Sequence, residues 1–110
     1  MAVTNLAELD ALVARVKAAQ RVFASFSQEK VDAIFRAASL AANQARIPLA
    51  RQAVEETAMG VLEDKVIKNH FASEFIYNKY KDDRTCGVIA THDEAGTMTI
   101  AEPVGLICGI

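Results

Sequence analysis

The chain has 110 residues, of which 52% are apolar and 24% charged, and its formal net charge is −2. This balance predicts one globular domain with a modest core and excludes a disordered chain. Basic and acidic residues are interspersed without a basic face, so we expect no nucleic-acid partner.

The first predicted helix runs from Asn5 to Phe26. Its apolar residues recur at steps of three and four and form one stripe: Leu6, Leu9, Leu12, Val13, Val16, Ala19, Phe23 and Phe26. Asn5 followed by Glu8 resembles a capping box, with Thr4 as an alternative cap. This N-terminus lacks the basic and apolar regions of a signal peptide. We therefore expect a cytoplasmic protein.

Three further helical segments are predicted. Ser27 is placed to cap a helix whose buried face carries Val31, Ile34, Phe35 and Ala38. Pro48 predicts a break at 44–47, because proline disfavours helical geometry in the residue before it. A helix is then expected from Pro48 to Ala58, with Gly60 as its stop. The last helix is predicted over 62–81, with its inward positions at Val66, Ile67, Phe71 and Phe75.

After Cys86 the apolar period changes from that of a helix to that of strands. Residues 88–91 and 97–101 predict a β-hairpin around the loop HDEAG, with Met98 and Ile100 on one face and Thr97 and Thr99 on the other. The final run, Val104–Ile110, has no alternation, which is typical of a strand buried in a parallel sheet. Such a strand needs a parallel neighbour, and nothing upstream supplies one. We therefore expect this chain to be the front end of a longer protein.

The residues that could carry chemistry favour structural roles. Cys86 and Cys108 match no metal or redox spacing and are expected to be small packing residues. The triplet His92-Asp93-Glu94 is interpreted as a solvated turn and not as a metal site. His70 and Glu74, four residues apart on a helix, are interpreted as a surface pair. No catalytic residue and no metal ligand is assigned.

Two stretches carry a family resemblance. The ending IAEPVGLICGI (100–110) resembles the segment that opens the cofactor-binding domain in the aldehyde dehydrogenase superfamily, and VLEDKVIKNHFASE (61–74) is similar to the bifunctional aldehyde–alcohol dehydrogenase branch. The resemblance implies an α/β parent fold. In this chain it implies a helical region at 1–85, a hairpin at 86–102 that serves as an oligomerisation arm, and the first strand of the NAD-binding domain at 103–110.

The resemblance also implies a function. The parent would interconvert acetyl-CoA and acetaldehyde with NAD(H), using coenzyme A as a substrate and a cysteine downstream of this chain. An iron-dependent alcohol dehydrogenase half would follow, and such proteins assemble into homo-oligomeric filaments. Ile110 would border the adenosine side of NAD, which makes it the single cofactor contact carried over. The fragment alone is expected to be inactive. The alternative is a free-standing helical interaction module whose hairpin and last strand dock onto a partner's sheet.

Overall fold

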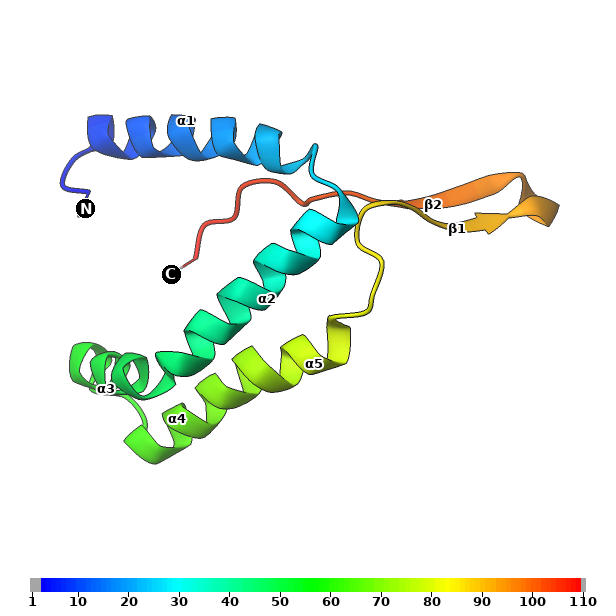
Figure 1. The fold of residues 1–110 in the computed structure, drawn as a ribbon. Coiled ribbons are helices and arrows are strands. Elements are labelled where there is room, and N and C mark those ends of the chain that lie inside the picture. Colours follow the sequence, from blue (N-terminus) through cyan, green and yellow to red (C-terminus); the bar gives the residue numbers. More distant parts are fainter. Residues whose placement is uncertain (1–2, 110) are drawn as a thin grey trace. The chain divides into compact units, whose positions relative to one another are not determined.

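A computed structural model describes residues 3–109 of the chain (Figure 1). The chain divides into two compact units. The first unit combines the N-terminal segment up to Gln28 with everything from Arg84 onward, and the second unit comprises Glu29–Asp83. The elements are mainly helices, with one two-stranded antiparallel sheet. This confirms the predicted content of helices followed by a hairpin.

Helix α1, Leu6–Phe23, belongs to the first unit and begins with the predicted cap. The Asn5 Oδ1 atom accepts a hydrogen bond from the Glu8 backbone N–H at 3.0 Å. The Glu8 carboxylate in turn accepts bonds from the Thr4 N–H at 2.8 Å and from the Thr4 hydroxyl at 2.9 Å. Both cap candidates therefore contribute. The helix ends three residues before the predicted Phe26, in a turn where the Phe26 N–H donates to the Phe23 carbonyl.

Helix α2 (Gln28–Gln44) begins directly after Ser27, as predicted, and α3 (Arg46–Thr57) follows it after Ala45. The helix breaks at Ala45, within the predicted range 44–47. The expectation that Ile47 would not be helical is wrong, because Ile47 and Pro48 both lie inside α3. Pro48 is tolerated in the first turn of a helix, where backbone N–H groups have no carbonyl partner in any case.

The end of α3 also differs from the prediction. Ala58 adopts the left-handed conformation at the C-cap (φ 52°), and its N–H donates to the Val54 carbonyl. Gly60 was the expected stop because glycine enters this region without a steric cost. It does have a positive φ (84°), but it lies in the loop beyond the cap. Alanine thus occupies the position that the sequence rule reserves for glycine.

The last helical segment is continuous but contains a π turn that was not predicted. It consists of α4 (Leu62–His70), the π turn Phe71–Phe75 and α5 (Ile76–Tyr80). In the π turn the Ile76 N–H donates to the Phe71 carbonyl five residues earlier. The expected inward face is wrong for three of its four members, because Ile67, Phe71 and Phe75 are more than half exposed. Ser73 is the buried side chain of this segment.

The described residues bury little apolar surface. Ala50 is their only fully buried apolar residue, whereas large apolar side chains such as Leu6, Met59 and Val104 stay exposed. Helices α2 and α5 of the second unit contact each other through partly buried side chains. One such contact joins the rings of Phe35 and Tyr77, whose centroids lie 5.1 Å apart. No helix among residues 3–109 is both long and apolar enough to cross a membrane.

Candidate functional site

The hairpin is the first candidate for a functional surface. Strands β1 (Gly87–His92) and β2 (Thr97–Ala101) pair in antiparallel fashion, and a short 3-10 turn over 93–95 joins them. Gly96 closes this turn with a φ of 61°, a conformation that glycine adopts readily. The pairing shifts between Val88 and Ala90, so Ile89 is the extra residue of a β-bulge.

The two faces of the hairpin differ as predicted. On the polar face, the His92 Nε2 atom lies 3.3 Å from the Thr99 Oγ1 atom, a cross-strand hydrogen bond. On the other face, Met98 and Ile100 are exposed by 58% and 53%. Two-stranded hairpins are at best marginally stable in water without a packed face. Among the described residues nothing covers Met98 and Ile100, so this face is suited to contact with another surface.

A glutamine clamp holds the segment that leads into the hairpin. The Gln28 Oε1 atom accepts hydrogen bonds from the backbone N–H groups of Thr85 (2.7 Å) and Cys86 (3.0 Å). The Gln28 Nε2 group donates to the Thr85 hydroxyl at 2.9 Å. Gln28 is 57 residues from Thr85 and 58 residues from Cys86, so no local sequence pattern predicts these hydrogen bonds. Cys86 is half-buried, and its packing role stays a prediction.

The segment after the hairpin differs from the predicted strand. Residues 102–109 have no regular secondary structure, and Cys108 is exposed where a buried residue was expected. The physical reason is that a strand forms only against another strand, and none of the described strands pairs with this segment. Leu106 and Ile107 instead line an apolar groove of about 750 Å³ along α1, together with Val16, Ala19, Phe23 and Phe26. Ile110, the one predicted cofactor contact, lies outside the described residues.

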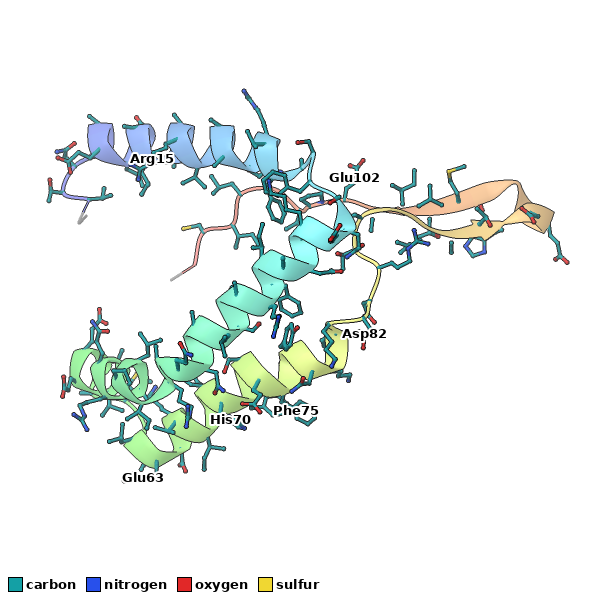
Figure 2. The ribbon with its side chains drawn as sticks, in the orientation of Figure 1. Arg15, Glu63, His70, Phe75, Asp82 and Glu102 are labelled. Carbon is teal, nitrogen blue, oxygen red and sulfur yellow. The ribbon has the colours of Figure 1, made fainter. Side chains whose placement is uncertain are left out.

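His70, Glu74 and Asn43 form a polar cluster on the surface of the second unit. The His70 Nδ1 atom lies 3.6 Å from the Glu74 Oε2 atom, and both side chains are about half exposed, so the predicted surface pair is confirmed. Asn43 of α2 joins the two: its Nδ2 group donates to Glu74 at 2.6 Å, and its Oδ1 atom lies 3.2 Å from His70 Nδ1. Figure 2 marks His70 on the helix opposite α2. The cluster ties α2 to the long helix.

No metal centre is built by the part of the chain that the structure describes. Residues 3–109 contain no group of three or more histidine, cysteine, aspartate or glutamate side chains placed to hold an ion. His92, Asp93 and Glu94 belong to a strand end and a turn. The candidate sites described above are contact surfaces: the hairpin face, the groove along α1 and the cluster around His70.

Known proteins similar to this chain are oxidoreductases. The chain is 71% identical to the bifunctional aldehyde–alcohol dehydrogenase of Escherichia coli K12 over all 110 residues, which are 12% of that protein. The match lies in the N-terminal region of the relative. The chain corresponds to the N-terminal region of aldehyde–alcohol dehydrogenases. The aldehyde–alcohol dehydrogenase of Clostridium acetobutylicum is 56% identical over the same 110 residues, which are 13% of its length.

A solved aldehyde dehydrogenase structure shares the fold of this chain. An acetylating aldehyde dehydrogenase from Geobacillus thermoglucosidasius matches 80% of this chain with a TM-score of 0.74 and 38% identity. The matched part is 20% of that protein. No protein-family model matches the chain. The chain thus spans about an eighth of the bifunctional relatives and a fifth of the solved one.

Proposed function

We propose that this chain is the N-terminal part of a coenzyme A-acylating aldehyde dehydrogenase within a bifunctional aldehyde–alcohol dehydrogenase of fermentative ethanol metabolism. The observation that carries the proposal is the 71% identity to the Escherichia coli enzyme along the whole chain. The solved enzyme of Geobacillus thermoglucosidasius supports the acylating half, because it is an acetylating aldehyde dehydrogenase and is 38% identical to this chain over the matched part.

The proposed reaction converts acetaldehyde, coenzyme A and NAD into acetyl-CoA and NADH, or runs in reverse. A cysteine elsewhere in the polypeptide would add to the aldehyde carbonyl, and bound NAD supplies the hydride acceptor. Iron would belong to the alcohol dehydrogenase half. This proposal assigns no chemical step to the described residues of this chain.

The chain's own part is structural. We assign residues 1–85 to a helical region, 86–102 to an oligomerisation arm and 103–110 to the start of the NAD-binding domain, where Ile110 would border the cofactor. The exposed apolar face of the hairpin supports the arm, since such a face is stabilised when another subunit covers it. The homo-oligomer, its filament form and a cytoplasmic location belong to this proposal.

The test is an assay of the full-length protein that contains this chain. NADH oxidation is followed after acetyl-CoA is added, and NADH formation after acetaldehyde and coenzyme A are added. We expect both reactions to depend on the coenzyme A substrate, and we expect residues 1–110 alone to show neither. A full-length protein that forms NADH from acetaldehyde equally well with and without coenzyme A would overturn the acylating assignment.

A further inference from the structure

We draw no further inference here: the strongest candidate, the apolar pocket between α2, α3 and α4 that Phe35, Leu49 and Lys65 line, carries nothing, because the structure does not show what covers it in a chain that spans about an eighth of its bifunctional relatives.

Discussion

The side chain of Gln28 accepts a hydrogen bond from the backbone N–H of Cys86, 58 residues further along the chain, at 3.0 Å. The same oxygen accepts a second bond from the Thr85 N–H. One amide thus joins the start of α2 to the point where the chain enters the hairpin. The orientation of the hairpin's first residues depends on this side chain, although it lies far from them in sequence.

We expect Gln28→Ala to loosen the entry to the hairpin. The substitution leaves two backbone donors without their protein acceptor, which costs about 1–2 kcal/mol when water can partly replace it. Hydrogen exchange of the full-length protein should show faster exchange in the peptide over 84–92. Gln52→Ala is the matched control, since the Gln52 side chain is exposed on α3 and makes no hydrogen bond to the described residues. Equal protection in the two variants would contradict the clamp.

The features predicted from the sequence are those set by neighbouring residues. The Asn5 cap, the start of α2 after Ser27 and the alternating hairpin faces each depend on contacts within a few positions. The inward face of the last helix was assigned wrongly because periodicity finds an apolar stripe without finding what covers it. The exposed position of Phe71 and Phe75 could be learned only from the packing of α2 against the opposite side.

Other features were missed because a general rule gave way to local contacts. Ala58 takes the left-handed cap in place of Gly60, and Pro48 sits inside the first turn of α3. No sequence pattern predicted the π turn. Its one distinctive residue is Ser73, whose burial is known only from the structure. The Gln28 clamp spans too many residues for any local pattern to reveal it. For the candidate surfaces, the hairpin was predictable, and the exposed face of the last helix was not.

The π turn should depend on Ser73. Its hydroxyl donates to the Asn69 carbonyl at 2.6 Å and lies 3.3 Å from the His70 carbonyl, at the start of the π turn. Because Ser73 is buried, Ser73→Ala should lower the free energy of local opening by about 1 kcal/mol. Hydrogen exchange over 69–76 measures it. Ser39→Ala on α2 is the control, and an unchanged rate at 69–76 would show that the backbone alone holds the turn.

The N-terminus of α1 should respond to acid. Hydrogen bonds from the Thr4 backbone N–H and hydroxyl hold the pKa of Glu8 below its ordinary value. A carboxylate with a depressed pKa stabilises the folded form at pH above its unfolded value, and this contribution disappears as pH falls through the folded pKa. A peptide over 1–27 should therefore lose helicity by circular dichroism on acidification, and Glu8→Gln should lose less. An identical pH profile for both peptides would contradict the cap's role.

The apolar face of the hairpin should matter more to assembly than its polar face. Ile100→Lys puts a charge where we propose that another subunit packs, and burial of an isoleucine contributes about 1.5–3 kcal/mol. The association constant of the full-length protein should therefore fall by about tenfold to a hundredfold. Thr97→Lys adds the same charge to the opposite face and should leave association nearly unchanged. Sedimentation velocity over a range of concentrations compares the two. If both substitutions weaken association equally, the contact is made by the hairpin's backbone edge and not by Met98 and Ile100.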